Sequence, residues 1–461
     1  MKYKHFKQAL LFKVGSVIKF KHMKKLPTSD YKLLEVDGQE YVFLTGCQEI
    51  MEITNPLLTA YFNPTCESEA KGTNEEVFEE LTSALISKRD VVHIREDPNR
   101  NPRQVMLILN TTHRCNMACS YCFAFTKHQQ AKPMPINIAE KALRNLLRDF
   151  PETEQYMFYF FGGEPLLCKD LIRDTVSIVE QTFRDYPSKK FGFLLNTNGI
   201  LLNDSELLQF FKEKDFTITV SIDGPEEVND SCRMLNSGEG SFRHIMAGIR
   251  ALQRYEVKFN LRATISPRTK NLLGIFQFFE NLAIPYAYAF TINASEKNKQ
   301  ETEITSLAWG HIQEEYHQVF GFLTKKLLHG ETIYNMDFKR KLAIIKQQMV
   351  RTHSCEAGRA NFLVDEQGDY YTCQNMLPYH QNIGNLEDGI HSEKQELLKT
   401  QFIADLKDCQ QCWARYLCGG GCQTERIFNT TSLDIYCKII RFEWNEAIIA
   451  FIRMNRLKDI K

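Results

Sequence analysis

Between residues 105 and 292, apolar runs of strand length alternate with amphipathic runs of helical length. The strand-like runs are VMLILN, YMFYFFGG, FGFLLNTNG, FTITVSIDG, FNLRATIS and YAYAFTI, which begin at Val105, Tyr156, Phe191, Phe216, Phe259 and Tyr286. The helical runs between them are AEKALRNLLRDF, LIRDTVSIVEQTF, SELLQFFKEK, FRHIMAGIRALQR and LLGIFQFFENL. Short polar junctions separate the runs, a pattern typical of βαβ units. The chain is therefore predicted to be α/β, with a parallel sheet or partial barrel of about six units.

The residues before this region have a different pattern. YKLLEVDGQEYVFLTG holds two strand-like runs around the turn-forming pair Asp37-Gly38, and NEEVFEELTSALISK has helical periodicity. These features predict a small winged-helix-like unit. The polar linker REDPNRNPRQ, residues 95–104, carries two prolines and marks a boundary.

After the alternating region, the charged stretch 293–306 predicts a solvated loop, and helical segments follow to about Val350. Cysteine and glycine then dominate from Cys355 to Cys437. The predicted domains are residues 1–97, the winged-helix-like unit; 105–320, the α/β barrel; and 321–461, a cysteine-rich region with flanking helices.

Composition narrows the class of protein. The chain has 461 residues with 57 basic and 57 acidic side chains, a formal charge of zero that gives no support for nucleic acid or an anionic membrane as partner. The sequence has neither a secretory signal pattern nor an apolar run of membrane-spanning length, which predicts a cytoplasmic protein. Fourteen cysteines in a reducing compartment favour metal binding or redox chemistry over disulfides.

Three of these cysteines form a C-x3-C-x2-C array directly after the first predicted barrel strand. Cys115, Cys119 and Cys122 would lie at the strand's carboxyl end, where parallel α/β folds place their active sites. A structural zinc site takes four protein ligands, and a catalytic one is usually rich in histidine. An iron–sulfur cubane also takes four thiolates, so three would leave one iron open to a small molecule.

With Tyr121 before its last cysteine, the array resembles the signature of radical S-adenosylmethionine (SAM) enzymes. Further motifs follow in the order of that family: Gly162-Gly163-Glu164-Pro165, Asn196-Thr197-Asn198-Gly199 and Ser221-Ile222-Asp223-Gly224. The resemblance implies a partial (β/α)6 barrel and a SAM site. The residues predicted to bind SAM are Gly162, Gly163, Glu164, Pro165, Asn196, Asn198, Ser221, Asp223 and Arg233.

These residue types also suit the ligand chemically. Glycines let backbone come close to a ligand, a carboxylate pairs with the SAM ammonium, and hydroxyl, amide and guanidinium groups hold ribose and carboxylate oxygens.

The C-terminal cysteines resemble the seven-cysteine SPASM pattern of radical SAM enzymes that carry two auxiliary [4Fe–4S] clusters. By that resemblance, Cys409, Cys412, Cys418 and Cys437 would complete one cluster, and Cys355, Cys373 and Cys422 would hold the other. This second set has three cysteines, which predicts an open iron able to bind a substrate thiolate. Cys47, Cys66, Cys168 and Cys232 are the other candidates for its fourth ligand, although isolated cysteines are more often small buried apolar residues.

Gln374 marks a departure from one subgroup. In sulfatase-maturing SPASM enzymes an acidic residue follows the cysteine equivalent to Cys373 and acts as a base, a role a neutral amide cannot take. The resemblance therefore implies a peptide maturase of the ranthipeptide or sactipeptide type, which forms thioether bonds from cysteine sulfur to carbon. Its cofactors would be three [4Fe–4S] clusters and SAM, with no catalytic side chain.

The expected partners are a ribosomally made precursor peptide, with its leader bound by the N-terminal unit, and an external flavodoxin-like or ferredoxin-like electron donor. Two alternatives stay open. One is a carbon–carbon crosslinking or sulfatase-maturase-like dehydrogenating enzyme of the same superfamily. The other is a zinc-stabilised binding protein without radical chemistry, since zinc would also fit CxxC pairs.

Overall fold

The computed structural model describes residues 26–54, 56–62, 83, 85, 101–122, 132–267, 269–291, 304–428 and 430–460. Most of the helix predicted in NEEVFEELTSALISK, much of the 95–104 linker and most of the charged stretch 293–306 lie outside these residues.

A ten-stranded sheet forms the centre of the molecule, in the order β13-β12-β11-β10-β4-β5-β6-β7-β8-β9. Its six consecutive parallel strands are β4 (Gln104–Asn110), β5 (Gln155–Phe161), β6 (Lys190–Thr197), β7 (Thr217–Ser221), β8 (Lys258–Ile265) and β9 (Tyr286–Phe290). Each coincides with one of the six predicted strand-like runs. The predicted parallel sheet is confirmed.

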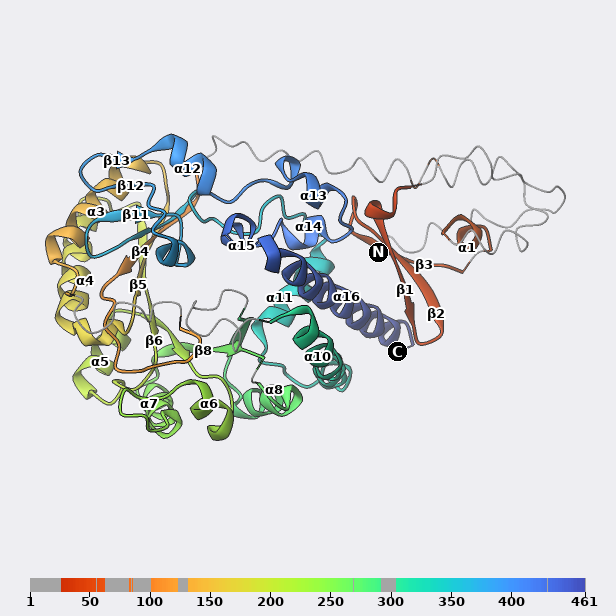
Figure 1. Ribbon diagram of the computed structural model, residues 1–461, viewed down its shortest axis with the longest axis horizontal. Helices are drawn as coiled ribbons and strands as arrows, with labels where there is room; N and C mark the ends of the chain where they lie inside the picture. Colours follow the sequence, from red (N-terminus) through yellow and green to blue (C-terminus); the bar gives the residue numbers. More distant parts are fainter. Residues whose placement is uncertain are drawn as a thin grey trace.

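Helices connect these strands and cover the outside of the curved sheet (Figure 1). They are α3 (Ile136–Asp149), α4 (Lys169–Phe183), α5 (Ser205–Glu213), α6 (Glu226–Cys232), α7 (Phe242–Arg254) and α8 (Leu272–Leu282). All except α6 were predicted. In α6 five of seven residues are acidic or small polar, so the segment lacks the apolar stripe that marks a helix in a sequence.

The two faces of the parallel strands differ in character. In β5 every second side chain is buried, and Tyr156, Phe158 and Phe160 are fully enclosed in the core. Asn196 of β6 and Ser221 of β7 are half-buried, on the opposite alternation from the buried apolar residues of their strands. Since successive side chains point to opposite faces, both residues lie on the inner face of the barrel.

The cysteine-rich region continues the same sheet. β10 (Asn361–Val364) pairs in parallel with β4, aligning Phe362 with Leu107. The antiparallel strands β11 (Asp369–Tyr371), β12 (Gly384–Asn385) and β13 (Gly389–Ile390) extend it. The helices of the C-terminal part are α10 (Ser306–Leu328), α11 (Met336–Gln347), α12 (Ser392–Leu398), α13 (Lys407–Gln410), α14 (Arg415–Cys418), α15 (Gln423–Phe428) and α16 (Thr430–Ile460), with the 3-10 helices η8 (Gln374–Tyr379) and η9 (Ile403–Asp405).

The described N-terminal residues form a separate antiparallel sheet, β1 (Tyr31–Val36), β2 (Gln39–Leu44) and β3 (Glu49–Glu52), followed by α1 (Pro56–Phe62). The predicted hairpin is confirmed: Asp37 and Gly38 both have positive φ, 52° and 75°, as a two-residue turn between twisted strands requires. The sheet lies beside the carboxyl half of α16 (Figure 1). It contacts that helix through β1.

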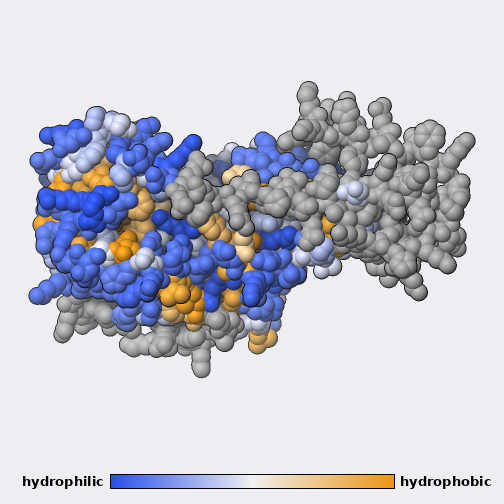
Figure 2. Space-filling model, turned by 90° about the horizontal axis from the view of Figure 1, so that it is seen from above, coloured by the Kyte–Doolittle hydropathy of each residue, from blue (hydrophilic) through white to orange (hydrophobic). Residues whose placement is uncertain are grey.

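In the described part of the chain, no helix combines the length and apolar character needed to cross a membrane. On the face seen in Figure 2, hydrophilic residues cover most of the described surface, and hydrophobic residues show in smaller areas.

Candidate active site and cysteine clusters

The C-x3-C-x2-C array lies on the loop after β4 and is held by backbone pairing with the segment after α6. Ala118 N donates to Met234 O at 2.8 Å, and Ser120 N donates to Cys232 O at 2.9 Å. Burial raises the pKa of the Cys115 thiol to about 11 and that of Cys119 to about 12. Such thiols stay protonated at neutral pH unless a metal centre binds them, because coordination removes the proton.

The glycines of the GGEP motif let the end of β5 pack against this loop. Gly163 N donates to Thr112 O at 2.7 Å, and a Cβ at Gly163 would lie 2.2 Å from Arg114 O. At Gly162, φ is +141° and a Cβ would lie 2.4 Å from Thr112 O. The close approach that the glycines permit is thus between two segments of the chain. The buried Pro165 begins the 3-10 turn η6 (Pro165–Cys168) that follows.

Glu164 ties the ends of two barrel strands together. Its fully buried carboxylate accepts hydrogen bonds from Thr197 Oγ1 at 2.8 Å, from Asn198 N at 2.7 Å and from Leu166 N at 3.0 Å. Burial raises the pKa of this carboxyl, and the hydrogen bonds oppose that shift. The contact of Glu164 with SAM stays a prediction. In the structure, the residue also holds the ends of β5 and β6 together.

Asn198 connects the end of β6 to the cysteine loop. Its Nδ2 lies 3.7 Å from Cys115 Sγ and donates to Asn116 Oδ1 at 2.7 Å. Asn236 Nδ2 donates to Cys115 O at 2.9 Å. The sequence motifs did not single out Asn116 and Asn236, because neither residue belongs to a strand-end signature.

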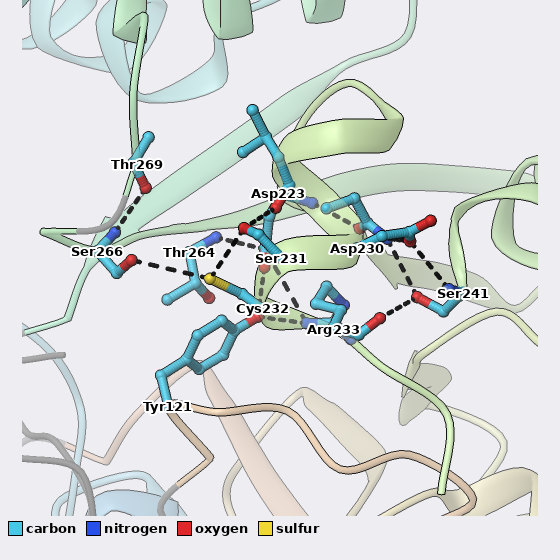
Figure 3. A network of polar contacts seen from close by, with 12 residues as sticks. Tyr121, Asp223, Asp230, Ser231, Cys232, Arg233, Ser241, Thr264, Ser266 and Thr269 are labelled. Atoms are coloured by element: carbon cyan, nitrogen blue, oxygen red, sulfur yellow. Dashed lines mark hydrogen bonds and ion pairs between the residues drawn. The ribbon is translucent and has the colours of Figure 1, made fainter. Parts of the chain in front are cut away.

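Asp223, Arg233 and Tyr121 form a buried polar group at the barrel mouth (Figure 3). Tyr121 Oη donates to Asp223 Oδ2 at 2.6 Å, Arg233 Nη1 donates to Tyr121 Oη at 2.6 Å, and Thr264 N donates to Asp223 Oδ1 at 2.9 Å. The aromatic residue of the array is therefore the link between the cysteine loop and the SIDG motif.

Arg233 keeps one polar atom unused. The residue is 6% exposed, and its Nε has no hydrogen-bond partner among the described residues. A buried guanidinium with a spare N–H is suited to an anionic oxygen. This observation fits the predicted contact with the SAM carboxylate.

Four of the C-terminal cysteines enclose a cavity of about 310 Å³. Its lining includes Cys409 of α13, Cys412, Cys418 of α14 and Cys437 of α16, together with Arg426. Burial raises the pKa of Cys418 to about 12. Four thiols around one cavity match the donor set of a [4Fe–4S] cluster. We call Cys409, Cys412, Cys418 and Cys437 the quartet.

Cys355, Cys373 and Cys422, which we call the triad, also lie within electrostatic range of one another. Burial raises the pKa of Cys373 to about 11, with Cys422 and Cys355 contributing in the same direction. Cys355 is exposed, and its Sγ lies 3.1 Å from Thr400 Oγ1.

The remaining candidate ligands of the triad lie elsewhere or outside the described residues. Cys168 Sγ lies 3.9 Å from Thr111 O, and Cys232 Sγ lies 4.0 Å from Ser266 Oγ, both in the barrel. Cys47 packs against the N-terminal apolar cluster. Cys66 falls outside the residues that the structure describes.

In the described part of the chain, no three His, Cys, Asp or Glu side chains stand close enough to hold a single metal ion. The ligands of a cubane bind different irons, so their sulfur atoms stand farther apart than the ligands of one ion.

Comparisons with known proteins support the prediction made from the motifs. Residues 109–270 match the model of the Radical SAM superfamily. A cysteine-type anaerobic sulfatase-maturating enzyme of Clostridium novyi (strain NT) is 26% identical over 370 residues, covering 75% of this chain and 96% of that protein. A serine-type anaerobic sulfatase-maturating enzyme of Bacteroides thetaiotaomicron is 25% identical over 357 residues, covering 70% of this chain and 84% of that protein.

The fold is shared with the solved structure described as native anSMEcpe with bound AdoMet and Kp18Cys peptide. The TM-score is 0.65 at 21% identity, covering 77% of this chain and all of that one.

Residues 109–270 therefore form a radical SAM domain, and the chain has the predicted partial barrel with a cysteine-rich C-terminal region. The family match favours radical chemistry over the zinc-stabilised binding protein. Enzymes of this superfamily use SAM and a [4Fe–4S] cluster, and Cys115, Cys119 and Cys122 lie inside the matched residues.

Proposed function

We propose that this enzyme is a peptide maturase that joins a cysteine sulfur of a ribosomally made peptide to the carbon of another residue. The observation that carries the proposal is the composition of the triad. Three cysteines gather there, and one of them, Cys355, is exposed. A cluster held by three thiolates has one iron free for a thiolate from outside, and exposure at Cys355 favours access by a peptide.

Each proposed cofactor has candidate binding residues in the chain. Cys115, Cys119 and Cys122 would hold the cluster that binds SAM, and the triad and the quartet would hold two auxiliary [4Fe–4S] clusters. When bound, these groups supply electron transfer and the abstraction of a hydrogen atom. The chain's part is to bind and orient: Arg233 offers its spare N–H to the SAM carboxylate, while Glu164 and Asn198 hold the strand ends that frame the site.

The net reaction requires no acid or base from the protein for the carbon centre. Forming C–S from C–H and S–H removes two electrons and two protons from the peptide. One hydrogen atom leaves with the adenosyl fragment of SAM. The thiol's proton and the second electron remain, and the electron needs an acceptor nearby, a role suited to the auxiliary clusters.

The partners follow from this chemistry. The N-terminal antiparallel sheet would bind an extended leader peptide by adding it as a strand to its edge. A flavodoxin-like or ferredoxin-like protein would supply electrons. Fourteen cysteines favour a cytoplasmic location, where thiols stay reduced.

A second candidate, oxidation of a cysteine or serine to formylglycine, is favoured by the names of the relatives from Clostridium novyi and Bacteroides thetaiotaomicron. Against it stands Gln374, which follows Cys373 at the start of η8. A neutral amide cannot accept the proton that this oxidation releases.

Mass spectrometry of the product separates the two candidates. The anaerobically reconstituted enzyme is incubated with SAM, a reductant and the small peptide encoded beside its gene. Thioether formation removes two hydrogens per ring and blocks one thiol from alkylation. Formylglycine formation from cysteine removes the sulfur atom from the peptide. Formylglycine formation from serine leaves all thiols free. Either reaction creates an aldehyde that reacts with hydrazine. Either formylglycine result overturns the proposal.

The variant Cys355→Ala tests the triad directly. We expect it to cleave SAM but to form no thioether, with Cys168→Ala as a matched control that keeps both activities. Full crosslinking by Cys355→Ala would contradict the role given to the triad.

A further inference from the structure

The short helix α15 connects the two auxiliary cysteine sets. It begins directly after Cys422 of the triad. Its buried Thr424 places Oγ1 3.8 Å from Cys373 Sγ, also in the triad. Two residues later, Arg426 Nη2 donates to Cys409 Sγ of the quartet at 2.6 Å.

The guanidinium of Arg426 is held firmly in this position. Its Nε donates to Gly420 O at 2.6 Å, which fixes the plane of the group, and its backbone N donates to Cys422 O at 3.2 Å. The side chain also lines the quartet cavity. A planar, permanently charged donor is thus aimed at a ligand sulfur.

Arg351 joins the two sets from a second direction. Its Nη1 donates to Leu417 O at 3.1 Å, beside Cys418 of the quartet, and its Nη2 donates to Ser354 O, beside Cys355 of the triad. Two arginines therefore lie between the cysteine sets, and Arg426 donates directly to a cysteine sulfur of the quartet.

We propose that Arg426 is a positioning residue that sets the reduction potential of the quartet's cluster above the value it would have without this hydrogen bond. The potential of an iron–sulfur cluster depends on its net charge and on hydrogen bonds to its sulfurs. A cationic donor on Cys409 stabilises the reduced, more negative form more than the oxidised form. With this hydrogen bond, the quartet's cluster accepts an electron more readily than it would without it. The donor lies on α15, farther along the helix than the end that follows Cys422 of the triad. The inference rests on the auxiliary clusters of the proposed function but not on its thioether product.

The test is a redox titration followed by electron paramagnetic resonance, with no peptide present. The full-length chain carries Cys115→Ala, Cys119→Ala and Cys122→Ala, which removes the signal of the SAM cluster. In this background Arg426→Gln is expected to move one of the two auxiliary waves to a more negative potential. Arg426→Lys, which keeps the charge but not the planar donor, is expected to move the same wave by a smaller amount.

Arg441→Gln is the matched control, because Arg441 lines the same cavity and acts on Cys437 through its charge. In Arg441→Gln, the reduction potential of the quartet's cluster should shift less than it does in Arg426→Gln. Unchanged potentials in Arg426→Gln at full iron content overturn the proposal. So does loss of the quartet's iron in both Arg426 variants, because that result assigns the residue to cluster assembly. Peptide crosslinking is scored separately, so a failed function leaves this measurement intact.

Discussion

At the residue scale, Glu164 has a structural role that its motif does not indicate. The sequence predicts a carboxylate facing a ligand ammonium, while the structure gives its oxygens three protein donors. A buried carboxylate with such partners stabilises the fold, because each donor would otherwise be left without a partner.

Replacing Glu164 with glutamine tests this positioning role. The amide NH2 cannot accept a hydrogen bond, so either Asn198 N or the donors on Oε1 lose their partner. We expect the free energy of unfolding to fall by about 1–3 kcal/mol, measured by urea denaturation. Glu213→Gln, at an exposed site that accepts from Gln209, should stay within about 0.5 kcal/mol of wild type. Unchanged stability with lost SAM binding would mean that Glu164 acts only on the ligand.

Asp365 gives a pH-dependent prediction. Its Oδ1 accepts from Gln367 N at 3.0 Å and from Asp369 N at 2.9 Å in the β10–β11 turn, and burial raises its pKa to about 6. The folded state therefore holds the proton more tightly than the unfolded chain. Its stabilising contribution is complete below about pH 4, the ordinary range of aspartate, and is lost as the pH rises through about 6.

Asp365→Asn keeps the acceptor oxygen without a charge. The variant should gain stability relative to wild type as the pH rises from about 4 to about 6, and the gain should then level off. Urea titrations across this range measure the difference, with exposed Asp388→Asn as control. A gain that stays constant with pH would contradict the raised pKa.

At the scale of elements, the N-terminal sheet docks on the loop that carries the quartet. Arg415, between Cys412 and Cys418, pairs with Asp30 at 2.6 Å, and both side chains are buried. Thr45 Oγ1 donates to Trp413 O at 2.8 Å, and the rings of Phe43 and Trp413 meet edge to face at 6.2 Å. The sheet therefore supports the segment on which three of the quartet cysteines lie.

Breaking the buried pair should loosen that loop. Asp30→Ala leaves the Arg415 charge without its carboxylate, and we expect a loss of about 3–5 kcal/mol in unfolding free energy and less iron per chain. Asp37→Ala is the matched control, since Asp37 pairs with Arg453 between the same sheet and α16, but at the surface. There the loss should be no more than about 1 kcal/mol. Equal losses in the two variants would contradict a special role for the buried pair.

Elements with local signals were predictable, and those that depend on distant partners were not. The barrel strands and the Asp37-Gly38 turn are encoded in alternating apolar runs and turn residues. Nothing within NFLV indicates that β10 pairs with β4, because the partner residues are about 250 positions away. The contacts of Arg415 and Arg426 were missed for the same reason, whereas the resemblance to the SPASM pattern had grouped the four cysteines that line the quartet cavity.

For the whole molecule, the cysteine-rich region has two kinds of support. β10 is held by the barrel sheet, and Cys437 lies on α16, which packs on α10 and α11. Between Lys399 and Phe428, by contrast, the helices are η9, α13, α14 and α15, none longer than six residues. Isolated helices of this length are unstable in water, so this stretch would need the proposed auxiliary clusters in place of a larger core.

Removing iron should therefore unfold one part of the molecule and spare another. After chelation under mildly oxidising conditions, we expect hydrogen-exchange protection to be lost in residues 399–428 and kept in β4 to β8 and in β10, because the parallel sheet does not depend on metal. Cys409→Ala, which disables the quartet, should reproduce the loss around α13 and α14 without chelation. Restoring iron and sulfide to the wild-type chain should restore protection and release protons, since thiols with raised pKa values bind iron as thiolates. Undiminished protection of residues 407–418 after complete iron removal would mean that the quartet loop folds through its contacts with the N-terminal sheet alone.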